Sequence, residues 1–201
     1  MTTLLLTRHA ETVWHAENRY AGADSDIDLT PAGARQAERL AGWVQAHDVD
    51  AVVSSPVRRA RETATPAALA AGVPVEIDPD LREVGFGIAD GHTLAELAPA
   101  VVAAFRGGRP FPGAEPPAPA AERVAAALRD VAARHPDRTV LVVAHSTALR
   151  LGLCALLGLP PARYREVFPR LDNVAVAELA LADGGRAGLL SLNVPCTTTK
   201  E

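Results

Sequence analysis

Two histidines and several arginines stand directly after apolar runs in this sequence. Arg8 and His9 follow a run of leucines, His145 follows the run "VLVVA", and Arg59 lies shortly after the run "AVVSS". A neutral imidazole can attack phosphorus and form a covalent intermediate that water then resolves. Planar guanidinium groups match phosphoryl oxygens and stabilise the charge that these oxygens carry in the transition state. Histidines and arginines in these positions therefore favour phosphoryl transfer.

Two other chemistries fit the same residues less well. Ser146 in "VVAHSTALR" suggests the nucleophile of an α/β-hydrolase, but such an enzyme needs a histidine later in the chain, and none of the six histidines follows Ser146. Alanines at positions 144 and 148 also replace the glycines of that sharp turn. The histidines lack the spacing of metal ligands, and neighbouring arginines would repel a divalent cation. We therefore expect neither a metal nor another cofactor.

Apolar runs typical of strands alternate along the chain with amphipathic stretches typical of helices. The expected strands are residues 3–8, 51–55, 74–77, 139–145, 173–179 and 187–192. The expected helices are residues 30–47, 56–72, 119–136 and 146–158. This alternation predicts an α/β fold, a three-layer sandwich whose mostly parallel sheet is flanked by helices on both faces. In such sheets ligands bind where strands end, so the polar residues after the first, second and fourth strands should converge there.

Local signals indicate where elements begin and end. Thr30 is expected to cap a helix that has Pro31 in its first position, and Gly72 to end the next helix. We expect one domain over residues 1–195, with a lid segment at about 92–120 that contains a stretch rich in glycine and proline. Residues 196–201 are expected to form a flexible tail.

The bulk composition narrows the class of protein. The chain has 201 residues, of which 48% are hydrophobic and 22% charged, and its formal net charge is -4. These values are typical of a soluble globular protein and argue against nucleic-acid binding. No secretory signal precedes Leu4, and the apolar stretch 149–159 is too short to span a bilayer. Two cysteines and the high alanine and arginine content favour a bacterial cytoplasmic protein without disulfides or membrane association.

Four stretches match, in order, the signature blocks of one family. "TRHAET" is similar to an Arg-His-Gly-Glu-Thr block, and "SSPVRRARETA" to Ser-Ser-x-x-x-Arg-Ala-x-x-Thr-Ala. "LREVGFGIADG" is similar to Leu-x-Glu-x-x-x-Gly-x-x-x-Gly, and "VVAHSTALR" to the last block. The chain thus resembles the histidine phosphatase superfamily, also called phosphoglycerate-mutase-like, over nearly its whole length.

The resemblance implies a role for each matching residue. His9 would attack phosphorus and become phosphohistidine. Glu83 would give a proton to the leaving alcohol and later take one from the attacking water. The groups that would hold the phosphoryl oxygens are Arg8, Arg59, His145 and the backbone N–H of Ser146.

Several positions depart from the family pattern. His15 stands where many members have a phosphate-contacting asparagine, so that it either donates a hydrogen bond to phosphate or lies at the rim of the site. Ala21 replaces a threonine that contacts substrate in the mutases. Glu11 is expected to be a structural ion-pairing or capping group. The candidate substrate-binding residues are His15, Ala21, Gly22, Phe86, Arg106 and Arg109.

The lid segment separates three functions within the resemblance. The mutases carry a longer, more basic insertion, whereas the only cations in residues 92–120 are Arg106 and Arg109. A lightly basic pocket favours hydrolysis of a small phosphate monoester over phosphoglycerate mutase activity. A protein-phosphohistidine phosphatase is a further alternative, although such members tend to lack much of the lid segment. The expected partner is a small-molecule phosphate ester, with a second copy of the chain as a candidate for a homodimer.

Overall fold

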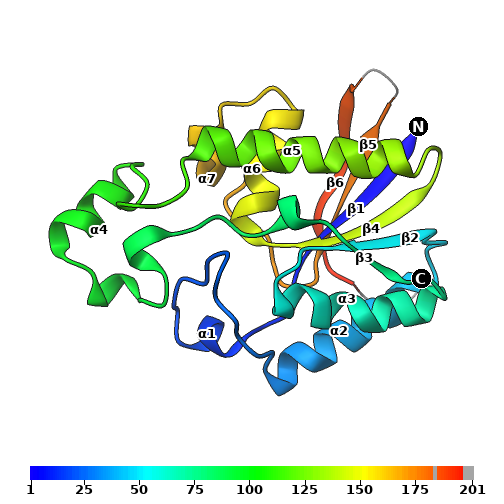
Figure 1. The fold of residues 1–201 in the computed structure, drawn as a ribbon, viewed down its shortest axis with the longest axis horizontal. Helices are drawn as coiled ribbons and strands as arrows, with labels where there is room; N and C mark the ends of the chain where they lie inside the picture. Colours follow the sequence, from blue (N-terminus) through cyan, green and yellow to red (C-terminus); the bar gives the residue numbers. More distant parts are fainter. Residues whose placement is uncertain (183–184, 197–201) are drawn as a thin grey trace.

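A twisted six-stranded sheet forms the centre of the computed structural model, which describes residues 1–182 and 185–196 (Figure 1). Its strand order is β3-β2-β4-β1-β5-β6. The strands are β1 (Thr2–Arg8), β2 (Ala51–Ser54), β3 (Val75–Ile77), β4 (Thr139–Ala144), β5 (Val176–Leu181) and β6 (Ala187–Val194). The first four strands in this order are parallel, and β5 and β6 extend the sheet in antiparallel fashion. The expected α/β sandwich with a mostly parallel sheet is confirmed.

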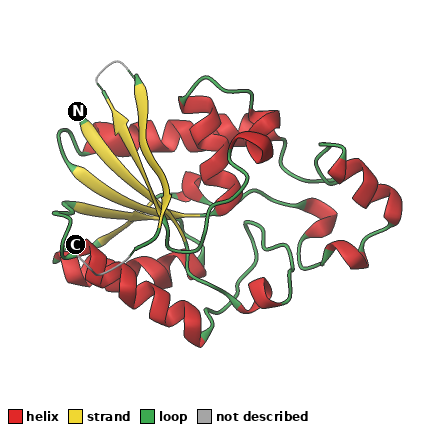
Figure 2. Ribbon diagram, turned by 180° about the vertical axis from the view of Figure 1, so that it is seen from behind, coloured by secondary structure: helices red, strands yellow, loops and turns green. Residues whose placement is uncertain are grey.

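Helices cover both faces of the sheet (Figure 2). They are α1 (Val13–Ala16), α2 (Pro31–Val44), α3 (Arg58–Ala71), α4 (Pro99–Arg106), α5 (Pro117–Arg134), α6 (Ser146–Leu156) and α7 (Tyr164–Val167). Four short 3-10 turns complete the described part: Pro79–Leu81, Gly87–Ala89, Leu94–Glu96 and Pro161–Arg163. Helices α5 and α6 pack on one face, and α2 and α3 pack on the other.

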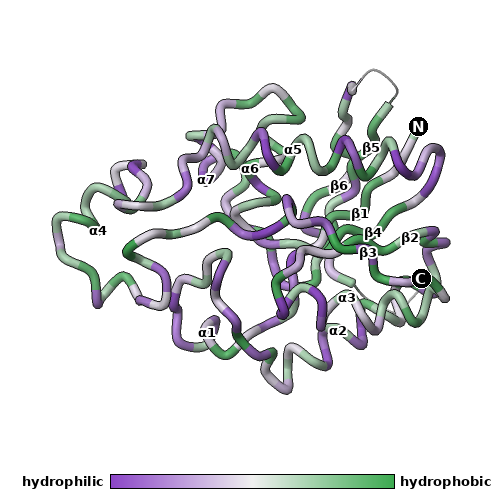
Figure 3. The backbone as a smooth tube through the Cα atoms, in the orientation of Figure 1, coloured by the Kyte–Doolittle hydropathy of each residue, from purple (hydrophilic) through white to green (hydrophobic). Residues whose placement is uncertain are grey.

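The sheet is apolar on both faces because side chains alternate along each strand. Leu4 and Leu6 of β1 join the core beneath α5 and α6, whereas Leu5 joins the core beneath α2 and α3. The tube coloured by hydropathy is mostly green, that is hydrophobic, along the central strands (Figure 3). Cys154 lies in the first of these cores with no exposed surface, as expected of a small core residue.

The local sequence signals act as expected at two helix ends. The Thr30 hydroxyl accepts a hydrogen bond from the Gly33 N–H at 2.9 Å and donates one to the Glu11 carboxylate at 2.7 Å. Pro31 begins α2, and Gly72 ends α3 in the left-handed conformation with φ 71°. Glu11 therefore fixes the start of α2, in keeping with its expected structural role.

Strand β5 begins later than expected. Val174 has a φ of 62°, which no strand residue adopts, so the ladder starts at Val176 instead of Asn173. Asn173 instead forms an isolated bridge with Arg8. Because of this bend, Asn173 lies against the end of β1, where it supports the site described below.

The lid segment extends away from the sheet (Figure 1). It contains α4, which begins at Pro99, and it leads into α5, which begins at Pro117; proline suits the first position of a helix. Phe105 and Phe111 stack at a centroid distance of 4.0 Å. The guanidinium of Arg165, in α7, lies 3.8 Å from the Phe105 ring centroid. These contacts join the lid segment to the body.

The start of the expected tail is packed against the fold. The Cys196 thiol is buried and donates a hydrogen bond to the Val174 carbonyl at 3.0 Å. The remainder of that expectation, residues 197–201, lies outside the described residues. Within the described part, no helix combines the length and the apolar character that crossing a membrane requires.

We predict that Gly33→Ala lowers the free energy of unfolding by about 1–3 kcal/mol. A Cβ at Gly33 would lie 2.0 Å from the carbonyl oxygen of Glu11, so the loop after β1 must shift. Gly188→Ala is the control, because a Cβ there meets nothing within 4 Å. Urea unfolding of both variants tests this, and equal stability of the two would contradict the close packing.

Candidate active site

The site lies at the carboxyl ends of three neighbouring strands. Arg8 ends β1 and pairs with Ala144 at the end of β4. The His9 N–H donates to the Ala144 carbonyl at 2.9 Å, and the Ser55 N–H, after β2, donates to the Val143 carbonyl at 3.0 Å. These bonds bring the polar residues that follow the three strands to one edge of the sheet.

His9 is held in one tautomer. Its Nδ1 lies 2.8 Å from the carbonyl oxygen of Ala10, an acceptor, so Nδ1 carries the proton. Its Nε2 lies 3.2 Å from Nε of Arg59, a donor, so Nε2 carries the lone pair. The Asn173 amide donates to the His9 carbonyl at 2.7 Å and steadies the backbone there. The nitrogen that faces the guanidinium is therefore the unprotonated one.

The surroundings keep His9 neutral. The ring is 4% exposed, and this burial lowers the pKa of His9 well below 6.5. Nearby His145, Arg59 and Arg8 add to this effect. The ring centroid of His145 lies 5.2 Å from that of His9.

Arg59 is fully buried at the first turn of α3, and backbone carbonyls surround its guanidinium. Nη1 donates to the Ser25 carbonyl at 2.7 Å, and Nη2 donates to those of Ala21 and Gly22 at 3.1 and 3.0 Å. Ala21 and Gly22 thus act on the site through their backbones. A Cβ at Gly22 would lie 2.2 Å from the carboxylate of Asp90, so glycine fits this turn.

His145 follows β4 and has one ring nitrogen engaged. Its Nε2 lies 2.8 Å from the Ser55 hydroxyl, whereas its Nδ1 is buried without a partner. Burial first, and then Arg59 and Arg8, lower the pKa of His145 well below 6.5. A neutral ring that accepts from Ser55 at Nε2 carries its proton at Nδ1. It then offers one N–H donor.

Arg8 also has an unused donor. Its Nη1 donates to the Leu171 carbonyl at 3.2 Å, and its Nη2 contacts Nε2 of His15, but its Nε is buried without a partner. Burial lowers the pKa of Arg8 to about 10, which leaves the guanidinium charged at neutral pH. Buried polar atoms without a partner are costly, and two of them, Nε of Arg8 and Nδ1 of His145, lie near His9. The site therefore suits an oxygen-rich anion.

Glu83 comes from the loop after the first 3-10 turn, and its buried side chain lies against the first residues of α6. One carboxylate oxygen accepts from the N–H groups of Val84 at 2.9 Å and Ala148 at 2.8 Å, and the other accepts from Thr147 at 3.1 Å. These three donors fix the carboxylate beside the cleft that holds His9. Helix α6 thus positions His145, which is its N-cap residue, and Glu83, whose carboxylate accepts from N–H groups in the first turn of the helix.

A cleft of about 750 Å³ opens over these groups. Of the sequence-predicted residues, those that line it are Arg8, His9, His15, Ala21, Glu83, Phe86 and Ser146. Arg59 and His145 lie beneath it, fully buried. Arg106 and Arg109 are exposed on the lid segment and do not line the cleft.

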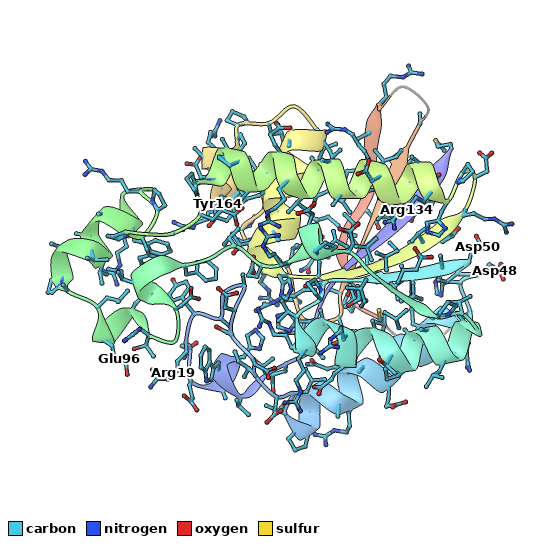
Figure 4. The ribbon with its side chains drawn as sticks, viewed as in Figure 1. Arg19, Asp48, Asp50, Glu96, Arg134 and Tyr164 are labelled. Atoms are coloured by element: carbon cyan, nitrogen blue, oxygen red, sulfur yellow. The ribbon has the colours of Figure 1, made fainter. Side chains whose placement is uncertain are left out.

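Several residues that line the cleft were not predicted from the sequence. Trp14, Tyr20 and Leu94 line it, although they lie on short elements that carry no periodic signal. Arg19 also lines the cleft and is paired with Glu96 at 2.7 Å, and Figure 4 shows these two side chains next to each other. The ion pair joins the loop after α1 to the lid segment. In the described ranges, 1–182 and 185–196, no three His, Cys, Asp or Glu side chains form a metal-ligand cluster.

Comparison with known proteins agrees with this geometry. Residues 4–194 match the model of the histidine phosphatase superfamily, branch 1. The chain belongs to this superfamily. The resemblance inferred from the four sequence blocks is thereby confirmed.

Three relatives show how this histidine phosphatase superfamily member compares. It is 33% identical over 186 residues to probable phosphoglycerate mutase GpmB of Yersinia enterocolitica, covering 89% of this chain and 85% of that protein. It is 32% identical to phosphoserine phosphatase 1 of Hydrogenobacter thermophilus, covering 98% and 94%. The crystal structure of phosphoserine phosphatase from Entamoeba histolytica with 3-phosphoglyceric acid superposes with a TM-score of 0.84, 30% identity and coverage of 96% and 97%.

Two buried neutral histidines predict a pH-dependent stability. Below the ordinary pKa of 6.5, the unfolded chain takes up protons at His9 and His145, whereas the folded chain does not. Lowering the pH from about 6.5 to about 5 should therefore reduce the free energy of unfolding, by up to about 1.4 kcal/mol per pH unit for each ring.

Urea unfolding at several pH values measures this slope. His9→Asn should reduce the slope, and His47→Asn, which alters an exposed ring after the C-terminal end of α2, is the control. The same slope in wild type and His9→Asn would show that His9 is not held neutral.

Proposed function

We propose that this protein is a phosphomonoesterase that hydrolyses a small-molecule phosphate ester through a phosphohistidine at His9. The observation that carries the proposal is the unprotonated Nε2 of His9, which lies among the donors of Arg8, Arg59 and His145. The similarity to a phosphoserine phosphatase that spans nearly the whole chain supports hydrolysis as the reaction.

The first step transfers the phosphoryl group to the enzyme. Nε2 of His9 attacks phosphorus, and the bond from phosphorus to the ester oxygen breaks. Arg8 and His145 donate to the phosphoryl oxygens, and Arg59 lends its positive charge. Glu83, in its protonated form, gives its proton to the leaving alcohol oxygen.

The second step returns the enzyme to its starting state. A water molecule attacks phosphorus as the carboxylate of Glu83 removes its proton, and the bond to Nε2 breaks. Inorganic phosphate leaves, His9 is again neutral, and Glu83 is again protonated. Every group that acts is a side chain of this protein, so we propose that turnover requires no metal.

The charges around the cleft favour a phosphatase over a mutase. Among the described residues that line it, the cations beyond Arg8 are Arg19 and Arg150. Arg19 is paired with Glu17 and Glu96, both at 2.7 Å. Arg150 donates to the carbonyls of Ser146 and Phe168 at 3.1 and 3.2 Å. A second phosphate, which a mutase must retain, thus meets few uncommitted donors.

We predict that His9→Ala lowers kcat/KM for phosphate monoesters by more than about a thousandfold, because the nucleophile is lost. The measurement is phosphate release from a panel of sugar phosphates, phosphoserine, phosphoglycerates and an aryl phosphate, with EDTA present. His47→Ala is the control and should retain full activity. Undiminished turnover by His9→Ala would overturn the proposal, and so would loss of wild-type activity in EDTA.

The same panel separates the remaining functions. Adding 2,3-bisphosphoglycerate with 3-phosphoglycerate should yield phosphate and no 2-phosphoglycerate. Formation of 2-phosphoglycerate would show a mutase instead. Hydrolysis of a phosphohistidine-containing protein, in preference to every small ester, would show a protein-phosphohistidine phosphatase.

Glu83→Gln should act differently on two kinds of ester. For an alkyl phosphate we expect kcat to fall about 10²- to 10⁴-fold, because the leaving alkoxide needs a proton. An aryl phosphate has a stable leaving group, so its phenol should appear in a rapid burst of about one equivalent, followed by slow hydrolysis of the intermediate. Rapid-mixing kinetics test this, and equal losses on both esters without a burst would remove Glu83 from the role of acid.

A further inference from the structure

Two consecutive peptide groups beside His9 are held by side chains that have no part in the proposed chemical steps. The peptide between His9 and Ala10 donates its N–H to Oγ1 of Thr63 at 2.9 Å. The next peptide, between Ala10 and Glu11, donates its N–H to Oε1 of Gln36 at 2.7 Å. Thr63 lies in α3 and Gln36 in α2, so both helices on this face of the sheet reach the loop after β1.

The second of these peptides carries the carbonyl that determines the protonation of His9. The Ala10 carbonyl oxygen accepts from Nδ1 of His9 at 2.8 Å. A peptide group is planar and trans, so its C=O and N–H point in opposite directions. Because a backbone N–H can only donate, the amide oxygen of Gln36 is the acceptor at the other end. Gln36 thus restricts the direction in which the Ala10 carbonyl points.

Helix α2 lies close enough to the loop for this contact. Positions 30, 33 and 36 are spaced by three residues, so each is a neighbour of the next on the helix surface. The Thr30 N–H donates to the Glu11 carbonyl at 3.0 Å. A Cβ at Gly33 would lie 2.0 Å from the same carbonyl oxygen, so glycine permits this approach. Gln36, one step further along, then reaches the N–H of Glu11.

Thr63 joins the first peptide to the backbone of Arg59. Its side chain is fully buried. Its hydroxyl accepts from the Ala10 N–H, and its single proton goes to the Arg59 carbonyl at 2.7 Å. One hydroxyl therefore connects the residue after the nucleophile with the residue whose guanidinium lies 3.2 Å from Nε2 of His9.

We propose that Thr63 and Gln36 are positioning residues for the nucleophile: they hold the backbone on both sides of Ala10, so that its carbonyl keeps the proton of His9 on Nδ1. Neither side chain lines the cleft. Without these two acceptors the Ala10 carbonyl turns away from the ring, and the proton moves in part to Nε2, the nitrogen that must attack. The kinetic consequence rests on the proposed function, whereas the place of the ring proton is measurable without turnover.

Substitutions in α3 separate this role from a general effect on the helix. Thr63→Val keeps nearly the same shape but has no hydroxyl, so the Ala10 N–H loses its acceptor. Thr63→Ser retains the hydroxyl and both of its hydrogen bonds. Thr65→Val is the matched control, because the Thr65 hydroxyl also donates to the carbonyl four residues earlier, at 2.8 Å, but Thr65 is exposed.

A substitution in α2 tests the same role from the other side. Gln36→Leu removes the oxygen that accepts from the Glu11 N–H. Gln36 is only half-buried, so this variant carries the test if Thr63→Val does not fold. Melting temperatures show which variants are folded.

The first measurement is long-range ¹H–¹⁵N correlation NMR of the His9 ring, which reports the protonated nitrogen. At about pH 7.5 we expect the proton on Nδ1 alone in wild type, Thr63→Ser and Thr65→Val. In Thr63→Val and Gln36→Leu we expect a mixture with the Nε2–H form. A proton on Nδ1 alone in either of these two variants, when folded, would overturn the proposal.

The second measurement compares kcat with the affinity for inorganic phosphate. Only molecules with a lone pair on Nε2 attack, so kcat should fall about 10- to 100-fold in Thr63→Val and Gln36→Leu. Phosphate affinity should stay within a few-fold of wild type, because Arg8 and His145 are unchanged. Thr63→Ser and Thr65→Val should keep kcat within a few-fold. Equal losses of kcat in all three threonine variants, or a parallel loss of phosphate affinity, would show general damage and overturn the proposal.

The outcome for the positioning role is distinguishable from that for the proposed function. Wild type that hydrolyses esters while Thr63→Val leaves the ring proton in place overturns the positioning role alone. Wild type that hydrolyses no ester, with the ring proton shifted in the variants as stated, overturns the phosphatase proposal and leaves the positioning role intact. Wild type with its proton on Nε2 of His9 overturns both.

Discussion

The hydrogen bond between Nδ1 of His9 and the Ala10 carbonyl is the contact on which the rest of the site depends. It places the proton on the nitrogen that faces the backbone and leaves Nε2 unprotonated toward Arg59. With the opposite tautomer, Nε2–H would face a guanidinium donor, and no nucleophile would be present. Burial keeps the ring neutral, so the proposed reaction needs no prior loss of a proton from His9.

Around this nitrogen, the backbone does much of the positioning. Three carbonyls hold the guanidinium of Arg59, whereas three N–H groups hold the carboxylate of Glu83. Backbone groups thus fix both side chains in place, and these groups do not need to reorganise during a reaction. The sheet keeps the groups in register, since His9 and His145 follow adjacent parallel strands.

The sequence predicted the sheet, the main helices and the polar residues that meet at the ends of the strands, because each depends on local signals. Apolar runs define the strands, Thr30 and Gly72 mark helix ends, and His9 and His145 directly follow strands. The partners of Arg59 were beyond prediction, because loop carbonyls at positions 21, 22 and 25 are present whatever the side chains are. The direction of the arginines on the lid segment depends on how α4 packs.

The linkage of the phosphoryl group in the covalent intermediate tests the account most directly. Brief reaction with an aryl phosphate, quenching in alkali, proteolysis and ¹H–³¹P NMR of the labelled peptide identify the phosphorylated atom. The geometry of His9 predicts phosphate on its Nε2. Phosphate on Nδ1 of His9, on another residue, or on no residue during active turnover would contradict the account.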